Sequence, residues 1–172
     1  MADINAAKES FIKELQALWS AEKLLTEAMP LMVETASNLG LKKNLALHLA
    51  ETDQHKIAIQ AICKQLGYDH EGEENEEVKN MLAEGERAMN TQVSGNNIDA
   101  AIIVGAIKIE HYEIEQYEVV ADQAEALGYE GVAQRLRLTL EEERQADAKL
   151  NFLEKELVKQ SSEIGATGLA LK

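Results

Sequence analysis

Acidic side chains and one histidine interrupt or flank the hydrophobic stripes of four stretches that otherwise repeat apolar residues every three or four positions. Such positions face the core of a helical protein and normally carry leucine or a similar residue. An ionised carboxylate buried there without a partner costs several kcal/mol. A compensating positive charge is therefore expected beside these residues. The seven side chains are Glu22, Glu51, His55, Glu110, Glu113, Glu143 and Asp147.

Divalent metal ions are the compensating charge that these residue types favour. Carboxylate oxygens together with an imidazole nitrogen suit iron or manganese. Residues four positions apart share a helix face, so Glu51 with His55, and Glu143 with Asp147, can each reach one metal. The sequence therefore predicts two metal ions held by all seven residues, with iron as the first choice and manganese or a mixed pair as alternatives.

Each candidate also has an interpretation without a metal. Acids make up 31 of the 172 residues, so any single one can belong to a solvated helix flank. His55 can equally be a hydrogen-bonded core histidine. His48, His111 and Tyr117 lie near the candidates, and we expect them to be packing residues or hydrogen-bond partners of the ligands. An acid on the inward face of all four stretches is what favours the metal.

Four long helices and one short helix are predicted to position these residues. Apolar residues recur at helical spacing, and one proline and 10 glycines provide few breaks. Asn97 or Asp99 is expected to cap the third long helix. The long helices are expected at residues 5–37, 41–66, 97–127 and 130–160, and the short helix at residues 75–90.

The connections between these helices predict a ferritin-like bundle. The connections near Gly40 and Gly128 are short, whereas residues 68–97 separate the second long helix from the third. Two antiparallel helical hairpins joined by one long crossover are typical of ferritin-like four-helix bundles. We predict a single all-α domain over residues 1–160, with the short extra helix in the crossover, and a loosely ordered tail at residues 161–172.

Charge and composition argue against several classes of protein. The net charge of −14 repels the phosphates of nucleic acids and anionic membrane surfaces, so neither is an expected partner. The single cysteine, Cys63, excludes an internal disulfide and a thiolate zinc cluster. No apolar run approaches the roughly 20 residues of a membrane span, and the first residues lack the basic and apolar regions of a signal peptide. A cytoplasmic protein is expected.

Four runs of the sequence resemble the YciE/YciF-like family of bacterial stress-associated, ferritin-like proteins. The resemblance covers about residues 5–160. It implies a bundle similar to those of rubrerythrin and ferritin, an accessory helix in the crossover, a dinuclear metal centre at the acids named above, and a homodimer. The runs are residues 18–30 (LWSAEKLLTEAMP), 48–52 (HLAET), 110–114 (EHYEI) and 141–150 (EEERQADAKL).

The ligand spacing departs from the wider ferritin-like pattern, which pairs Glu with His three residues later on two helices. Here Gln54 lies three residues after Glu51, and Ala146 lies three residues after Glu143. Because alanine cannot bind a metal, the spacing is expected to be four, with Asp147 in place of the second histidine. The extra carboxylate makes the site harder, which favours manganese or ferric iron and argues against oxygen chemistry of the ferritin type.

Three functions are open on this sequence. The first is a dinuclear metal protein that oxidises ferrous iron or reduces oxygen or peroxide, and whether it turns over as an enzyme stays open. The second is a non-catalytic helical stress or assembly protein whose inward acids are protonated or hydrogen-bonded. The third, an iron-storage shell like ferritin, is supported only by the chain length. The sequence indicates no particular redox partner.

Overall fold

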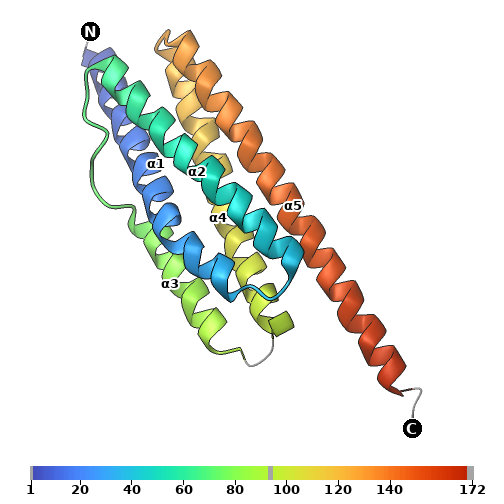
Figure 1. The fold of residues 1–172 in the computed structure, drawn as a ribbon. Helices are drawn as coiled ribbons and strands as arrows, with labels where there is room; N and C mark the ends of the chain where they lie inside the picture. The colour runs from blue at the N-terminus through green and yellow to red at the C-terminus, as the bar shows by residue number, and fades with distance from the viewer. Residues whose placement is uncertain (1, 93–94, 170–172) are drawn as a thin grey trace.

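The computed structural model describes the backbone of residues 2–92 and 95–169, and most of these residues are helical (Figure 1). Within them no strand occurs, which confirms the all-α prediction. No helix of the described residues is long and apolar enough to cross a membrane. The helices are α1 (Ala2–Thr35), α2 (Leu39–Leu66), α3 (Glu76–Asn90), α4 (Gly95–Ala126) and α5 (Glu130–Leu169).

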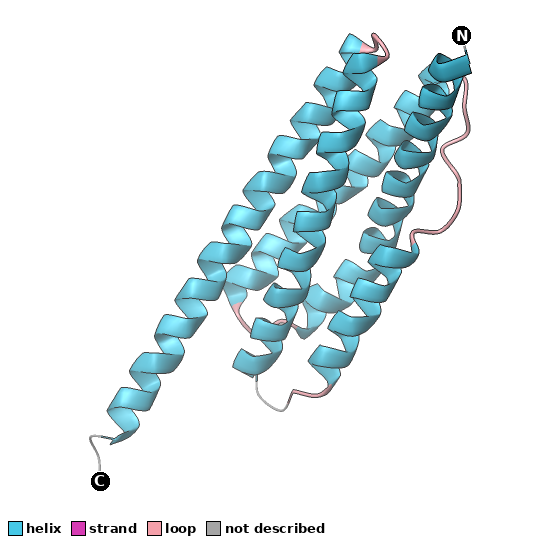
Figure 2. Ribbon diagram, turned by 180° about the vertical axis from the view of Figure 1, so that it is seen from behind, coloured by secondary structure: helices cyan, strands magenta, loops and turns pink. Residues whose placement is uncertain are grey.

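The four long helices form the predicted pair of antiparallel hairpins. Helix α1 packs against α2, and α4 packs against α5 (Figure 1). The hairpins meet where α1 contacts α4 and where α2 contacts α5. The crossover runs as an extended loop and then as α3, which packs on α4 and α1, and the view from behind shows the same arrangement (Figure 2). This is a ferritin-like bundle with one extra short helix.

Local side chains and glycines set the ends of these helices. The side chain of Asn38 accepts a hydrogen bond from the backbone N–H of Leu41 and so begins α2. Gly40, which the sequence predicted at the end of the first helix, lies inside α2 instead. Gly67 and Gly128 follow α2 and α4 with φ angles of 81° and 77°, a conformation that glycine adopts without strain.

Asp99 has a different role from the cap predicted for it. Because α4 begins at Gly95, Asp99 lies inside the helix and not at its end. Its side chain is buried, with 1% exposed. Its carboxylate accepts hydrogen bonds from the backbone N–H groups of Ser37, at 2.6 Å, and Asn38, at 2.8 Å. Asp99 therefore ties the turn between α1 and α2 to the start of α4.

Helix α5 runs past its predicted end at residue 160. The helix continues beyond Gln160 to Leu169, so the backbone of residues 161–169 is helical where a loosely ordered tail was expected. This part of α5 extends beyond the other helices (Figures 1 and 2). Residues 170–172 of the predicted tail lie outside the described residues.

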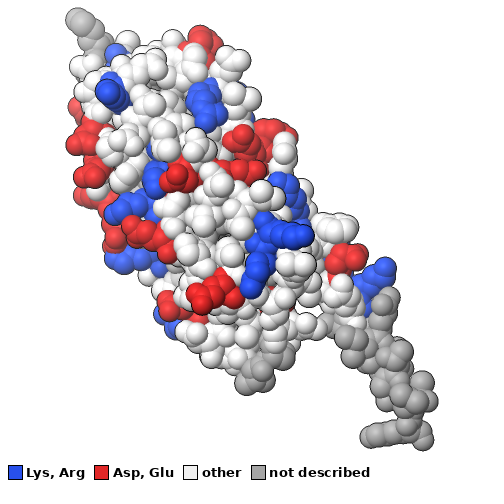
Figure 3. All heavy atoms as spheres, viewed as in Figure 1, with Lys and Arg blue, Asp and Glu red and all other residues white. Residues whose placement is uncertain are grey.

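Two apolar clusters fill the bundle, one toward each end. One contains Leu18 of α1 and Tyr117 of α4, and the other contains Leu25 of α1 and Ile109 of α4. Along α1, Glu22 falls between the two clusters. The same order holds on the other long helices, so a layer of polar side chains separates the two cores. The surface in Figure 3 carries interspersed acidic and basic side chains between uncharged ones.

Candidate metal centre

Six buried residues form what we call the polar layer between the apolar clusters. All four long helices contribute to it, and every member is at most 7% exposed. The three-residue spacing on α4 and the seven-residue spacing on α2 each place two side chains on one helix face. The members are Glu22 on α1, His48 and His55 on α2, Glu110 and Glu113 on α4, and Glu143 on α5.

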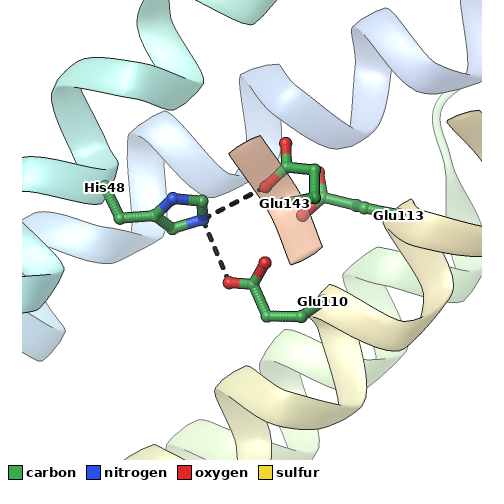
Figure 4. A group of neighbouring side chains, drawn as sticks. All are labelled: His48, Glu110, Glu113 and Glu143. Atoms are coloured by element: carbon green, nitrogen blue, oxygen red, sulfur yellow. Dashed lines mark ion pairs between the residues drawn. The ribbon is translucent and has the colours of Figure 1, made fainter. Parts of the chain in front are cut away.

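The first group within the layer, the His48 group, consists of His48, Glu110, Glu113 and Glu143. One possible ligand atom from each lies within 4.8 Å of the others. The Nε2 atom of His48 lies 3.0 Å from Oε1 of Glu110 and 3.8 Å from Oε2 of Glu143 (Figure 4). Three carboxylates and one imidazole therefore converge on one point from α2, α4 and α5.

The second group, the His55 group, consists of Glu22, His55 and Glu143, whose possible ligand atoms also lie within 4.8 Å of one another. The Nδ1 atom of His55 lies 2.8 Å from Oε1 of Glu143 and 3.5 Å from Oε1 of Glu22. Glu143 thus belongs to both groups, with one oxygen toward each histidine. This carboxylate therefore offers one oxygen to each group.

Unpaired donor atoms show that the layer fits metal ions. Buried polar atoms normally have hydrogen-bond partners, and each one without a partner costs free energy. In the polar layer, six buried atoms make no hydrogen bond, although two of them, Nδ1 of His55 and Oε1 of Glu143, form an ion pair with each other. The six atoms are Oε2 of Glu22, Nδ1 of His55, Oε2 of Glu110, Oε1 of Glu113 and both carboxylate oxygens of Glu143. Carboxylate oxygens with imidazole nitrogen form the donor set that iron and manganese prefer.

Burial raises the pKa of three acids of the layer, Glu22, Glu110 and Glu113. It raises the pKa of Glu113 well above its ordinary value, and the nearby charges of Glu22, Glu143 and Glu110 raise it further. Burial also raises the pKa of Glu110 to about 7, although its contact with His48 opposes the change. The pKa of Glu22 is raised by burial as well, although its contact with His55 opposes the change.

The carboxylates around the two histidines favour the charged form of both rings. Burial lowers the pKa of His48, but hydrogen bonds with Glu110 and Glu51 outweigh burial and raise it to about 10. Burial likewise lowers the pKa of His55, and contacts with Glu143 and Glu22 raise it to about 11. Metal binding at these histidines would have to displace protons, because a metal binds the neutral imidazole.

Comparison with known proteins identifies the family. Residues 6–163 match the family described as "Domain of unknown function (DUF892)". The protein YciF of Escherichia coli K12 is 33% identical over 159 residues, which cover 88% of this chain and 92% of YciF. The chain belongs to the DUF892 family.

Several solved structures have the same fold as this chain. The crystal structure of the E. coli stress protein YciF matches with a TM-score of 0.85 and 32% identity, covering 89% of this chain and 97% of that one. YcfI from Rhodopseudomonas palustris matches with a TM-score of 0.82 and 30% identity, covering 84% and 92%. A Xanthomonas campestris protein at 20% identity, with a TM-score of 0.75 over 93% and 99% of the two chains, shows the fold alone.

Two of the seven predicted ligands of this DUF892 chain lie outside both groups. Glu51 points along α2 to His48, where its Oε2 lies 3.4 Å from Nδ1. Asp147 lies one turn beyond Glu143 and accepts a hydrogen bond from Asn151 at 2.8 Å. The side chains of Glu51 and Asp147 are 38% and 23% exposed, so both lie nearer to the surface than the polar layer.

His48, which the sequence analysis treated as a packing residue or hydrogen-bond partner, lies in the polar layer, whereas Glu51 lies outside it. The signal was present, because His48 precedes His55 by seven residues and therefore shares its helix face. The spacing of four residues between Glu51 and His55 favoured Glu51 as a ligand, although Glu51 lies at the edge of that face. His111 is exposed and lies 3.1 Å from Asp147. Tyr117 is fully buried and donates a short hydrogen bond to Oε1 of Glu22.

Proposed function

We propose that this chain is a YciF-like metalloprotein with a dinuclear centre in its polar layer. Iron is the metal that we propose first, and manganese or a mixed pair is the alternative. The His48 group would hold one ion and the His55 group the other. Of the seven residues predicted from sequence, five belong to this proposed ligand set, and His48 joins them.

The observation that carries this proposal is the position of Glu143. Its two oxygens lie within reach of different histidines, at 2.8 Å from Nδ1 of His55 and 3.8 Å from Nε2 of His48. Neither oxygen has a hydrogen-bond partner, although the side chain is only 1% exposed. A buried carboxylate arranged in this way is costly unless cations face it on both sides.

The chemistry that we propose is oxidation of ferrous iron, or reduction of oxygen or peroxide. Two bound iron ions would supply the electrons for these reactions, because iron changes its oxidation state readily. The chain would hold the centre between two apolar clusters that exclude water and strengthen electrostatic interactions. Tyr117 would keep one oxygen of Glu22 engaged and leave the other toward the His55 group.

The cellular role that we propose is a stress response in the cytoplasm. E. coli YciF, which the chain resembles over most of its length, is described as a stress protein. Removal of ferrous iron or peroxide would be useful under oxidative conditions. The YciF-like resemblance and the polar layer support this role together, since neither one specifies the reaction.

Metal analysis of the purified protein tests the centre. We expect about two iron or manganese ions per chain after anaerobic loading. Glu143→Ala is expected to lose both ions, because Glu143 belongs to both groups. Glu22→Ala and Glu110→Ala are each expected to retain one, since each removes a ligand from a single group.

Glu141→Ala is the matched control, because Glu141 is an exposed acid on the same helix. It removes the same charge and is expected to keep both ions. Wild-type metal content in the Glu143→Ala protein would contradict the centre. Oxygen and peroxide consumption by the loaded protein would then separate turnover from metal binding alone.

We also propose a homodimer formed through an exposed apolar face of α2 and α5. Leu47 of α2 is 65% exposed and Phe152 of α5 is 62% exposed. Phe152 lies with Gly40 and Asn44 around one hollow between these helices, and Leu47 follows Asn44 by one turn. Light scattering tests the assembly, with Phe152→Glu expected to shift the mass toward the monomer.

A structural role without metal is the alternative function. The ion pairs of His48 and His55 with the surrounding carboxylates favour it, because they offset part of the acidic charge within the protein itself. This alternative predicts that chelators leave the melting temperature unchanged. The metal proposal predicts a fall, because ligands that bind only the folded state stabilise it.

A further inference from the structure

The geometry points to Glu142 and Glu51 as outer carboxylates that orient the two histidines of the polar layer. Each would bind the ring nitrogen that faces away from the layer, so that the other nitrogen is presented to a metal. This inference rests on the proposed dinuclear centre and deepens it. It assigns positioning roles to two half-exposed acids, one of which the sequence pattern had proposed as a direct ligand.

The contact between His55 and Glu142 is the clearer of the two. Nε2 of His55 lies 2.8 Å from Oε2 of Glu142, a normal hydrogen-bond distance. The ring is 1% exposed, whereas the carboxylate is 46% exposed, so Glu142 approaches from the surface side. A proton on Nε2, donated to Glu142, leaves the Nδ1 lone pair toward Glu143 and Glu22.

His48 also lies between an outer and an inner carboxylate, but here Nδ1 faces outward and Nε2 faces inward. Nδ1 of His48 lies 3.4 Å from Oε2 of Glu51, and Nε2 lies 3.0 Å from Oε1 of Glu110. Glu51 is partly exposed and lies one turn further along α2. The inner nitrogen is therefore Nε2 in His48 and Nδ1 in His55. The two rings approach the layer by different atoms, and each has a carboxylate on its outer side.

Outer carboxylates of this kind matter because they fix the tautomer and the ring plane of a metal-binding histidine. They also make the inner nitrogen a stronger donor. A role in orienting His55 explains the position of Glu142 better than a role in folding does, because a half-exposed acid contributes little to stability. Glu142 lies between the exposed Glu141, which belongs to neither group, and the buried Glu143, which belongs to both.

Titration with cobalt(II), a spectroscopic substitute for iron(II), tests the inference in the full-length protein. We expect Glu142→Ala and Glu51→Ala to bind two ions, with roughly 10- to 100-fold weaker affinity at the affected group. The visible spectrum of bound cobalt should change, because its histidine ligand loses its orientation. Glu142→Gln should fall between wild type and Glu142→Ala, since the amide oxygen still accepts the ring N–H but carries no charge.

Glu141→Ala and Glu141→Gln are the controls, and both should match the wild-type affinity and spectrum. The melting temperatures in chelator should agree among wild type and the Glu141 and Glu142 variants, which separates a positioning role from a structural one. Glu51→Ala is expected to melt lower in chelator, because its hydrogen bond with His48 also stabilises the charged histidine. Wild-type affinity and spectrum in Glu142→Ala would overturn this inference while leaving the metal centre standing. A wild-type protein that binds no cobalt, iron or manganese would overturn the proposed function and this inference with it.

Discussion

Tyr117 belongs to the apolar cluster beside the polar layer and holds one oxygen of Glu22. Its hydroxyl donates a short hydrogen bond to Oε1 of Glu22, and Oε2 of Glu22 has no partner. The tyrosine ring also meets the ring of His55 edge-on, with 6.3 Å between the ring centroids. Burial and the charge of Glu22 raise the pKa of Tyr117 well above its ordinary value, so the hydroxyl remains a donor.

Tyr117→Phe tests this arrangement, because it removes the hydroxyl and keeps the ring. We expect the free energy of unfolding in chelator to fall by about 1–3 kcal/mol, the cost of leaving a buried acceptor without its donor. Urea denaturation followed by circular dichroism measures the change. Tyr68→Phe, at an exposed tyrosine, should leave the stability unchanged. Equal stabilities for Tyr117→Phe and wild type would show that the hydroxyl bond contributes nothing.

Hydrophobic periodicity predicted which acids in the middle of a stripe face inward. It did not determine whether an acid at the edge of a stripe faces the polar layer or the surface. Glu22, Glu110 and Glu143 stand at positions where both flanking turns are apolar, so their inward direction could be predicted. Glu51 and Asp147 stand at the edges of their stripes. A rotation of a fraction of a turn there decides between the layer and the surface, and packing between helices sets that rotation.

At the level of helices, Asp99 fixes the relative position of the two hairpins at one end of the bundle. Its two carboxylate oxygens accept hydrogen bonds from successive backbone N–H groups, those of Ser37 and Asn38. The turn between α1 and α2 is thereby held against α4. These two hydrogen bonds join residues 61 and 62 positions apart in the sequence, so local helix-capping rules could not predict them.

Asp99→Ala is expected to destabilise the protein by about 1.5–3 kcal/mol, because it leaves two backbone donors without a charged acceptor. Denaturant unfolding in chelator measures the effect independently of metal. Asp122→Ala removes an exposed acid from the same helix, and it should change the stability little. If Asp99→Ala unfolds at the same denaturant concentration as wild type, the turn does not depend on this carboxylate.

The helices themselves were the most predictable part of the molecule, because long amphipathic stretches leave few alternatives. The helices predicted at residues 41–66 and 75–90 agree with α2 and α3 to within two residues at each end. The extension of α5 to Leu169 was not predicted, because two glycines and a weak apolar pattern made residues 161–172 look unstructured. Helix propagation from a long, well-packed segment outweighs such weak local signals.

Considered as a whole, the molecule places a layer of ionisable groups across a bundle whose two ends are apolar. Each hairpin supplies part of the layer, so the groups converge only when both hairpins pack together. The protonation of the layer is therefore linked to folding. Groups whose pKa values change on folding make stability depend on pH, and here the largest changes have the same sign.

The pKa changes of the two histidines and of Glu110 determine whether the stability rises or falls with pH. The pKa values of His48 and His55 rise from 6.5 to about 10 and about 11 on folding, so their stabilising contribution is complete below 6.5 and is lost as the pH rises through these values. The pKa of Glu110 rises from 4.5 to about 7, so folding is also favoured less as the pH rises through that range. Glu51 has the opposite sign, but its lowered pKa acts only in more acidic solution.

We therefore expect the melting temperature of the chelated protein to fall steadily between about pH 5 and about pH 9. Bound metal should reverse this trend, because it replaces the same protons and binds more tightly as they leave. The gap between loaded and chelated protein should widen with pH in thermal denaturation. His48→Gln should flatten the chelated curve above about pH 6.5, where the unfolded histidine has already lost its proton. A chelated protein that becomes more stable as the pH rises would show that the layer is not held together by protons in the absence of metal.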